Sequence, residues 1–313
     1  MAISPHTAEP LALRATQVAI PSRPPVARGE RLGSWQLIEV AGAGEFCHVF
    51  RAQPADSPPD VVATYAVKQL KTELSTDSRA IGLLRREARV GRAIRSPHVV
   101  PILDAQATRA PFYLVMPWLE GHSLAELLRS RAHLPPSIAL WIARQAAEGL
   151  DALHSAGWTH GDLKPANVMV APSGHVTLID LGLARRPTDE DRSVAVELAG
   201  TPRYMAPEVL LGVARADIRS DIYSLGAVLY EILTGRVPYA GDDAAALIEA
   251  QRAGEIAPLR EIVPLLPTAI AQLVQVILSK DPLRRPQTPR ELRDRLLALE
   301  VAHFAEEVTR LDA

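Results

Sequence analysis

The sequence predicts an α+β fold built as two lobes, a β-rich amino-terminal lobe with one main helix and a mostly helical carboxy-terminal lobe. Two patterns lead to this prediction. Up to residue 118, short apolar runs of strand length alternate with turns that contain glycine and proline, and one helical stretch lies among them. Beyond Ser123, apolar residues recur at helical spacing through most of the chain. A length of 313 residues leaves room for two modest cores.

The composition is that of an ordinary globular chain. Apolar residues make up 48% and charged residues 22%, which excludes a disordered or collagen-like protein. The formal net charge is -2 and neither end carries a basic block, so we expect no nucleic-acid partner. Cys47 is the only cysteine, which excludes an internal disulfide and fits a cytoplasmic location.

We also expect no membrane insertion. Residues 1–20 lack the basic start and unbroken apolar run of a secretory signal. The longest apolar stretch, residues 262–278, contains prolines and glutamines that a membrane span would have to desolvate. This stretch predicts a loop that leads into a core helix.

The predicted small lobe opens with a hairpin that contains a glycine-rich turn. Residues 1–33 hold many prolines without periodicity and predict a disordered leader. Residues 35–40 and 49–52 predict two strands, joined by a turn close to the pattern Gly-x-Gly-x-x-Gly-x-Val. Gly42 and Gly44 would let backbone N–H groups approach phosphates, although a glycine pair can also serve turn geometry alone.

The next strand and helix are predicted to supply an ion pair. Residues 61–68 predict a strand that ends in Lys68, which matches the strand-borne lysine that holds nucleotide phosphates. In the following helix, Glu87 lies beside the apolar face. Glu87 is therefore the natural partner for Lys68, and the alternative is an exposed glutamate in an arginine-rich helix.

The chain then passes from the small lobe to the large one. Residues 99–103 and 112–116 predict two further strands, and residues 117–121 predict a connector marked by proline and glycine. Residues 123–126 have the pattern of a capping box, which starts a helix. A long helix with apolar residues at regular spacing up to Gly157 leads into the next loop.

Residues 159–167, Thr-His-Gly-Asp-Leu-Lys-Pro-Ala-Asn, place an acid, a cation and an amide at short fixed offsets. Asp162 can accept a hydrogen bond from an attacking hydroxyl, Lys164 can neutralise a moving phosphoryl group, and Asn167 can bind a metal ion. An Asp-x-Lys pair in a loop can also be a solvated salt bridge. The phosphate loop and a metal-binding acid elsewhere in the chain favour the catalytic interpretation.

That metal-binding acid is Asp180. It ends a second predicted hairpin, residues 168–170 and 176–179, and an acid before glycine at a strand end can reach metal ions that bridge phosphates. Residues 183–199 are polar and irregular, and a long loop of this kind is usually functional. Helices are predicted over residues 221–233, 244–252, 269–278 and from Thr288 onward, with Leu292, Leu296 and Leu299 facing the core.

With these motifs in chain order, the chain from about residue 35 to 299 resembles the eukaryotic-type, or Hanks-type, serine/threonine protein kinase family, and looks like its bacterial members. The resemblance implies the bilobal protein-kinase fold, with ATP and magnesium, or manganese in its place, between the lobes. We place the small lobe at residues 34–118, the large lobe at 119–300 and a tail at 301–313.

The resemblance also implies roles for the catalytic residues. Asp162 would receive the proton of the substrate hydroxyl, Lys164 would touch the moving phosphoryl group, and Thr201 would orient both of them. Asn167 and Asp180 would bind magnesium. Two further acids would be structural: Asp221, which would brace the catalytic loop, and Glu208, which would pair with Arg285.

The nucleotide site implied by the resemblance draws on both lobes. Lys68 and Glu87 would pair to hold the phosphates below the glycine turn. The other residues implied in nucleotide binding are Gly42 and Gly44 in that turn, Val49, Ala66 and Met169 on the two faces of the adenine, Met116 as the gatekeeper, and Pro117 and Leu119, whose backbone would bond the adenine edge.

Three positions depart from the family's pattern. Cys47 replaces a glycine of the phosphate loop, Leu181 replaces the usual phenylalanine, and Gly161 replaces the arginine between His160 and Asp162. In the family that arginine gathers a phosphate on the activation loop, and charge-assisted pairing of that kind orders the loop.

Because Gly161 offers no guanidinium, we predict that phosphorylation of Thr188 or Ser193 changes activity little. Replacing both residues by Ala should therefore leave phosphoryl transfer within about tenfold of the unchanged chain. A larger loss, measured on a variant that is still folded, would count against the prediction.

The function expected from the sequence is ATP-dependent phosphorylation of Ser and Thr hydroxyls on protein substrates, including the chain itself through self-association. Small-molecule phosphotransferases form one alternative, because their catalytic loop also reads His-Gly-Asp, but the peptide platform at residues 201–208 favours a protein substrate. A pseudokinase scaffold that binds nucleotide without transfer is the other alternative. The presence of the complete set of motif residues argues against it.

Overall fold

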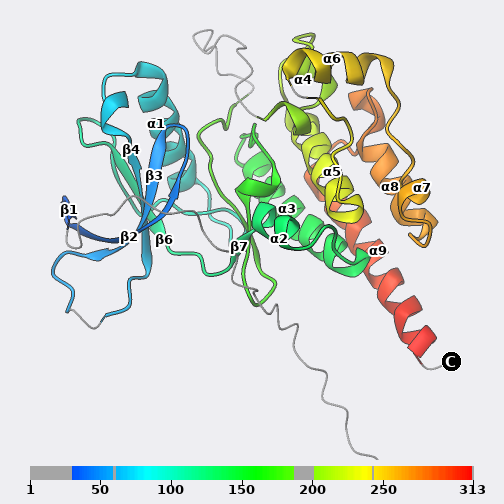
Figure 1. Cartoon of the computed structure of the whole chain (residues 1–313), viewed down its shortest axis with the longest axis horizontal. Coiled ribbons are helices and arrows are strands. Elements are labelled where there is room, and N and C mark those ends of the chain that lie inside the picture. The colour runs from blue at the N-terminus through cyan, green and yellow to red at the C-terminus, as the bar shows by residue number, and fades with distance from the viewer. Residues whose placement is uncertain (1–29, 59–60, 187–200, 242, 312–313) are drawn as a thin grey trace, which may run out of the picture.

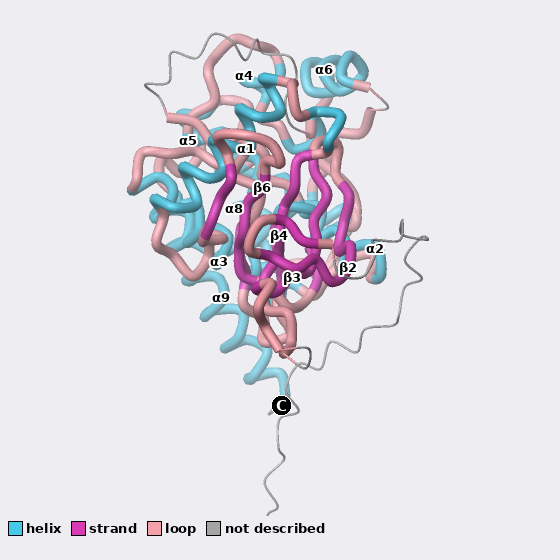
Figure 2. Tube along the Cα trace, turned by 90° about the vertical axis from the view of Figure 1, so that its left-hand side faces the viewer, coloured by secondary structure: helices cyan, strands magenta, loops and turns pink. Residues whose placement is uncertain are grey.

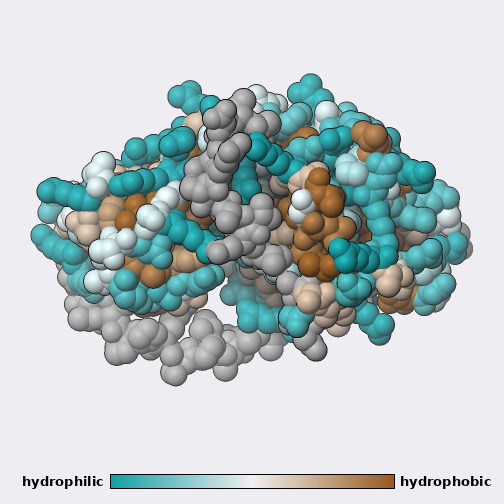
Figure 3. Space-filling view, turned by 90° about the horizontal axis from the view of Figure 1, so that it is seen from above, coloured by the Kyte–Doolittle hydropathy of each residue, from teal (hydrophilic) through white to brown (hydrophobic). Residues whose placement is uncertain are grey.

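The computed structural model describes residues 30–58, 61–186, 201–241 and 243–311. These residues form two lobes that lie side by side, a smaller one built on a β-sheet and a larger one built of helices (Figure 1). The predicted α+β bilobal fold is therefore confirmed. Seen from above, hydrophilic residues cover most of both lobes (Figure 3).

A twisted antiparallel sheet forms the small lobe, and Figure 2 shows its strands in front of the large-lobe helices. The strands are β1 (Arg31–Leu32), β2 (Trp35–Ala43), β3 (Cys47–Pro54), β4 (Tyr65–Leu70), β5 (Asp104–Gln106) and β6 (Tyr113–Pro117). They lie in the spatial order β1-β2-β3-β4-β6-β5. α1 (Ser78–Ala93) contacts β4 and β6, with Leu84 and Ala88 buried on its inner face.

Helices make up most of the large lobe. They are α2 (Leu124–Ser130), α3 (Pro136–Ser155), α4 (Pro207–Leu210), α5 (Ile218–Thr234), α6 (Ala244–Ala253), α7 (Leu259–Ile262), α8 (Thr268–Ile277) and α9 (Pro289–Leu311). A small sheet of β7 (His122–Ser123), β8 (Val168–Val170) and β9 (Val176–Leu178) lies at the junction with the small lobe. The predicted capping box is present, since Ser123 and Glu126 exchange side-chain and backbone hydrogen bonds at the start of α2.

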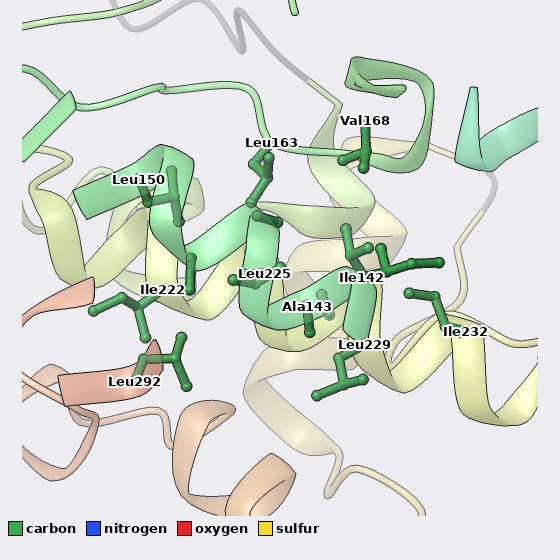
Figure 4. Packing of buried hydrophobic residues seen from close by; sticks show 14 of the residues in the cluster. Ile142, Ala143, Leu150, Leu163, Val168, Ile222, Leu225, Leu229, Ile232 and Leu292 are labelled. Atoms are coloured by element: carbon green, nitrogen blue, oxygen red, sulfur yellow. The ribbon is translucent and has the colours of Figure 1, made fainter. Parts of the chain in front are cut away.

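The core of the large lobe lies between α3 and α5. Ile142 and Leu150 of α3 and Leu225 of α5 belong to one buried cluster (Figure 4). Leu292 of α9 joins this cluster, and so does Leu163, which lies inside the loop that the sequence predicts to be catalytic. Burial of the Leu163 side chain therefore anchors that loop to the hydrophobic core of the lobe.

Two predicted strands differ from the structure. The strand predicted at residues 61–68 begins only at Tyr65 and continues two residues beyond Lys68, because Val61 and Val62 are exposed and lie outside the sheet. The strand predicted at residues 99–103 is wrong.

Residues 99–103 are extended but do not form a ladder. The backbone N–H groups of Val100, Ile102 and Leu103 donate in turn to carbonyls of β9, α1 and β6. Because each donor goes to a different element, no continuous pairing with one strand can form. The segment instead ties the two lobes together at the base of α1.

Several predictions concern the ends of the chain and its longest loop. Residues 1–29 of the predicted leader lie outside the described residues, as do Thr188 and Ser193. β1 already begins at Arg31, and α9 continues to Leu311 through residues that the sequence left as a tail. In the part of the chain that the structure describes, no helix combines the length and the apolar character needed to cross a bilayer.

Candidate active site

Lys68 and Glu87 form a buried ion pair in the small lobe. Lys68 stands in the middle of the sheet on β4, between Val49 of β3 and Leu114 of β6. Glu87 lies on the inner face of α1 and is only 2% exposed. The distance from Lys68 Nζ to Glu87 Oε2 is 2.6 Å. The structure therefore brings together the two residues that the sequence pairs.

Asp180 approaches the same ammonium group from the large lobe. Its Oδ1 lies 2.9 Å from Lys68 Nζ. The backbone of Asp180 has a φ of 64°, in the left-handed region that few residues other than glycine adopt. In the two residues after it, Leu181 is fully buried and Arg86 of α1 donates to the Gly182 carbonyl at 3.5 Å. Contacts from both lobes therefore hold Asp180 in place.

Burial and mutual charge shift the pKa of all three groups. Burial alone would lower the pKa of the Lys68 ammonium, but the charges of Glu87 and Asp180 outweigh it and hold that pKa above its ordinary value. Burial raises the pKa of Glu87 to about 6, against the opposing charge of Lys68. Burial would also raise the pKa of Asp180, but Lys68 holds it below its usual range. At neutral pH the Lys68 ammonium therefore lies between the charged carboxylates of Glu87 and Asp180.

We predict that ATP binding weakens as the pH falls from about 7.5 to about 5.5, because Glu87 becomes protonated. With a pKa of about 6, its carboxylate is almost fully charged at the higher pH and about one quarter charged at the lower, so affinity should fall about fourfold. Asp180 stays charged, since its pKa lies below its ordinary value, and then competes with the nucleotide for Lys68. Titration with a fluorescent ATP analogue measures this affinity.

The control for this prediction is Glu87→Gln, which cannot titrate. Protonation of the nucleotide itself affects both proteins equally, so the difference between their pH profiles reports Glu87 alone. If the variant loses affinity with pH as steeply as the unchanged chain, Glu87 is not the titrating group.

Asp162 is held at the centre of the catalytic loop by three donors. Its Oδ2 lies 2.7 Å from Lys164 Nζ and 3.1 Å from Asn167 Nδ2. Its Oδ1 accepts the backbone N–H of Thr201 at 3.1 Å. Thr201 thus reaches Asp162 through the main chain, a contact that any residue except proline could make. The three predicted catalytic residues and Asn167 lie together.

Asp221, at the start of α5, fixes the backbone that precedes Asp162. Its carboxylate is 3% exposed and accepts the N–H groups of His160 at 2.6 Å and Gly161 at 2.9 Å. Burial raises the pKa of Asp221, while His160 and the two N–H donors act in the opposite sense. These bonds satisfy two backbone donors that the tight loop would otherwise leave buried and unpaired.

Hydrogen bonds also tie the catalytic loop to the segment that carries Asp180. The Ile179 N–H donates to the Asn167 carbonyl at 3.0 Å, and the Ile179 carbonyl accepts a hydrogen bond from His160 Nε2 at 3.2 Å. The charge of Lys164 contributes to the low pKa of Asp180, so these two groups interact. The loop predicted to be catalytic and the segment predicted to bind metal therefore lie together.

Gly161 has a steric reason for being glycine in this chain. Its φ of +80° lies in the left-handed region, and a Cβ at this position would fall against the carbonyl oxygen of Leu183, inside van der Waals contact. An arginine here would have to displace the backbone that follows Asp180. The missing arginine is thus accompanied by a close approach of the two loops.

We predict that Gly161→Ala destabilises the fold more than Gly157→Ala. Gly157 has a nearly identical φ of +79°, but a Cβ there meets no atom within 4 Å, so that variant carries only the backbone strain of about 1–2 kcal/mol. Gly161→Ala carries the same strain and the clash with Leu183 in addition. Unfolding in urea measures both variants, and equal losses of stability would contradict the steric argument.

The residues predicted to bind magnesium present suitable atoms. Asn167 uses its Nδ2 for both hydrogen bonds to Asp162, at 2.7 and 3.1 Å, which leaves its amide oxygen for another ligand. Asp180 has a second carboxylate oxygen beside the one that faces Lys68. Within the described residues, no three histidine, cysteine or acidic side chains gather as a complete metal cage. This donor set fits magnesium, which takes few protein oxygens and completes its shell with phosphates and water.

The glycine turn leaves room for a ligand. A Cβ at Gly42 would meet no atom within 4 Å, one at Gly44 would meet only the Cys47 carbonyl at 3.7 Å, and neither glycine has a positive φ. Crowding and backbone strain therefore do not explain these glycines, and their approach to a phosphate stays a prediction. Cys47 is buried among apolar residues of the small lobe, and burial raises the pKa of its thiol to about 11, so it packs as a neutral side chain.

The residues expected around the adenine come from adjacent elements. Val49, Ala66 and Met116 lie on the neighbouring strands β3, β4 and β6, and Ala66 pairs directly with Met116. Pro117 ends β6 and Leu119 follows it, while Met169 lies on β8 in the large lobe. All of these positions except Ala66 are partly exposed. Their contact with adenine stays a prediction.

Sequence reasoning missed two contacts of the site. Arg86, one of several arginines in the helix that carries Glu87, reaches the Gly182 carbonyl. Its place directly before Glu87 could have indicated this contact, since adjacent residues on a helix lie about 100° apart and can flank the same face. His160 was missed as a donor to Ile179, and only the folded loop brings these two together.

A β-rich lobe with a buried lysine–glutamate pair, next to a helical lobe whose loop holds an aspartate, a lysine and an asparagine, defines the protein kinase class. Residues 35–297 match the family model of the protein kinase domain. The chain belongs to the protein kinase family.

Similar chains are bacterial serine/threonine kinases. The chain is 37% identical to PknE of Mycobacterium tuberculosis over 219 aligned residues, and this alignment covers 70% of this chain and 38% of PknE. It is 33% identical over 258 residues to PknD of the same species, covering 82% and 38%, and 30% identical over 265 residues to a probable serine/threonine kinase of Clostridium perfringens, covering 84% and 38%. The chain thus spans about 38% of the length of these relatives.

Proposed function

We propose that this chain is a serine/threonine protein kinase, which transfers the γ-phosphate of ATP to Ser and Thr hydroxyls of protein substrates, including its own. The observation that carries the proposal is the joining of two polar groups into one site. Lys68 lies within 2.9 Å of Asp180, and Asn167 lies within 3.1 Å of Asp162. The Ile179 N–H donates to the Asn167 carbonyl and the Ile179 carbonyl accepts from the His160 side chain, and these two bonds link the two groups.

The nucleotide would lie between the lobes, with its phosphates beneath the glycine turn. Lys68, oriented by Glu87, would hold the phosphates, and Asn167 and Asp180 would hold magnesium. Bound magnesium supplies charge neutralisation on the β- and γ-phosphates. Val49, Ala66, Met116 and Met169 would enclose the adenine.

Transfer then requires a base and a cation next to the acceptor. The Asp162 carboxylate accepts the proton of the Ser or Thr hydroxyl, while the oxygen of that hydroxyl forms a bond to the γ-phosphorus. The bond from that phosphorus to the oxygen of the β-phosphate breaks, and ADP leaves with the electron pair. Lys164, 2.7 Å from Asp162, neutralises charge on the moving group. Thr201 keeps the carboxylate pointed at the acceptor.

A single assay tests the proposal. The full chain is incubated with radiolabelled ATP, magnesium and a generic basic protein acceptor, with an Asp162→Asn chain as the blank. Label on protein, absent from the blank, supports the kinase. ATP binding without transfer would indicate a scaffold, and label on an aminoglycoside offered instead of protein would indicate a small-molecule phosphotransferase.

Three broader assignments belong to this proposal. The Lys two residues after Asp162, together with Gly-Thr-Pro at residues 200–202, supports Ser/Thr rather than Tyr acceptors. The single cysteine supports a cytoplasmic location. The lobes are assigned to residues 34–118 and 119–300, on either side of the connector after β6.

A further inference from the structure

The outer face of α1 carries a stripe of arginines. Arg85, Arg89 and Arg92 recur every three or four residues and all three are exposed, so they lie one above another along one side of the helix. We call these three residues the arginine stripe. Arg95, just beyond the helix, is exposed as well.

Few acidic side chains of the described residues neutralise the charges of the arginine stripe. Arg92 lies 3.7 Å from Asp104 with both side chains about half exposed, and Arg85 donates to the Ala107 carbonyl at 2.7 Å. In the part of the chain that the structure describes, Arg89 makes no ion pair or hydrogen bond through its side chain. Among the described residues, one acid, Asp104, therefore forms an ion pair with one of the three guanidinium groups.

Among the described residues, five arginines of other helices have acidic partners close in sequence. The ion pairs are Arg144 with Glu148, Arg219 with Asp217, Arg252 with Glu249, Arg293 with Asp294 and Arg295 with Glu291. The helix dipole favours a cation in the last turn of α1, which accounts for Arg92 but not for Arg85 or Arg89. A purely solvating face would accept lysine equally well, whereas three arginines suit planar, bidentate pairing with carboxylates or phosphates.

The inner face of the same helix holds the active site. Glu87 pairs with Lys68 at 2.6 Å, and Arg86 donates to the Gly182 carbonyl beside Asp180. α1 thus carries Glu87 of the candidate site on its inner face and the arginine stripe on its outer face. Any ligand that binds the stripe acts on the element that positions Lys68.

We propose that the arginine stripe is a docking surface for an acidic protein segment, whose charges are carried by carboxylates, and that docking there stabilises the Lys68–Glu87 pair. The three arginines span about 10 Å along the helix. Alternate side chains of an extended segment lie about 7 Å apart, so a short acidic run reaches all three. Docking on the stripe does not depend on the proposed kinase activity. The activating effect of docking does rest on that proposed function.

A nucleic acid fits the stripe less well. Tight binding to nucleic acid needs many phosphate contacts, and single strands also stack on aromatic side chains. The stripe offers three cations and no aromatic residue, in a chain whose formal net charge is -2.

Binding is tested first, on the full chain, by fluorescence anisotropy. The probes are a labelled peptide of alternating Glu and Ala, the same peptide with phosphoserine in place of Glu, and a single-stranded DNA of equal charge. Reversing two charges in Arg89→Glu/Arg92→Glu should weaken peptide binding by about tenfold or more, and raised salt should weaken it in the unchanged chain. Tighter binding of the phosphoserine peptide than of the Glu peptide would overturn the assignment of the occupant as an acidic segment.

The matched control is Arg129→Glu/Arg131→Glu, which makes the same change of net charge at exposed positions around the end of α2. It should leave peptide binding within about twofold. Equal losses in the two double variants, no peptide binding to the unchanged chain, or tighter binding of the DNA would each overturn the docking surface.

The activating effect of docking is tested with a neutral acceptor peptide and ATP. The acidic peptide should raise the rate of transfer in the unchanged chain and leave the rate of Arg89→Glu/Arg92→Glu at its basal value. Peptide binding without any change in rate would overturn the coupling. If the chain transfers no phosphate at all, the proposed function fails while the anisotropy result still decides the docking surface.

Discussion

Replacing Asp162 by Asn should lower phosphoryl transfer by on the order of a hundredfold or more, while ATP binding stays nearly unchanged. The amide cannot accept the hydroxyl proton. Its oxygen can still take the Thr201 N–H, but its NH₂ group would then face the Lys164 ammonium, which lies 2.7 Å from the carboxylate oxygen in the unchanged chain. The variant therefore loses both the base and the partner that places Lys164. Asn167 keeps its 2.7 Å hydrogen bond to the carbonyl of residue 162, and the substitution leaves Lys68, Glu87 and Asp180 in place.

Turnover at saturating ATP and the affinity for a fluorescent ATP analogue separate these effects. Asp294→Asn is a suitable control, because this aspartate is 58% exposed on α9 and, among the described residues, pairs only with the neighbouring Arg293. It should leave both quantities unchanged. Transfer by Asp162→Asn at more than about a tenth of the normal rate would remove Asp162 from the role of base.

Much of this site could be predicted because its residues follow local rules. Lys68 ends an apolar run and Glu87 flanks the apolar face of a helix, so strand and helix periodicity alone turn them toward a common interior. Asp162, Lys164 and Asn167 lie within one loop, where spacing limits how far apart they can be. For such residues the chain itself does most of the positioning.

The rest depends on contacts that periodicity does not encode. Residues 99–103 have the composition of a strand, but their donors go to three different elements, and only the packing of both lobes decides that. Thr201 was expected to orient both Asp162 and Lys164, and the contact described is its backbone N–H to Asp162, which no side-chain pattern reveals. The close approach of Leu183 to Gly161 likewise appears only when the two loops are brought together.

The second large effect concerns stability rather than catalysis. Arg285→Leu should destabilise the fold by about 3–5 kcal/mol, because it leaves the Glu208 carboxylate buried without its counter-charge. Arg285 donates to both oxygens of Glu208, at 2.7 and 2.8 Å, and its side chain is completely buried. It also donates to the carbonyls of Arg219 and Ser279, so one guanidinium joins α4, the start of α5 and the loop after α8.

Two comparisons isolate the cause of that loss in urea unfolding experiments. Arg284→Leu removes the adjacent arginine, which is 80% exposed, and should change the free energy of unfolding by no more than about 0.5 kcal/mol. Arg285→Leu/Glu208→Leu removes both charges and should be more stable than Arg285→Leu alone, since no buried carboxylate then lacks a partner. If the double variant is instead as unstable as the sum of its two single changes, the cost lies in lost packing and in the carbonyl contacts. In that case the charge of Glu208 does not explain why Arg285 is required.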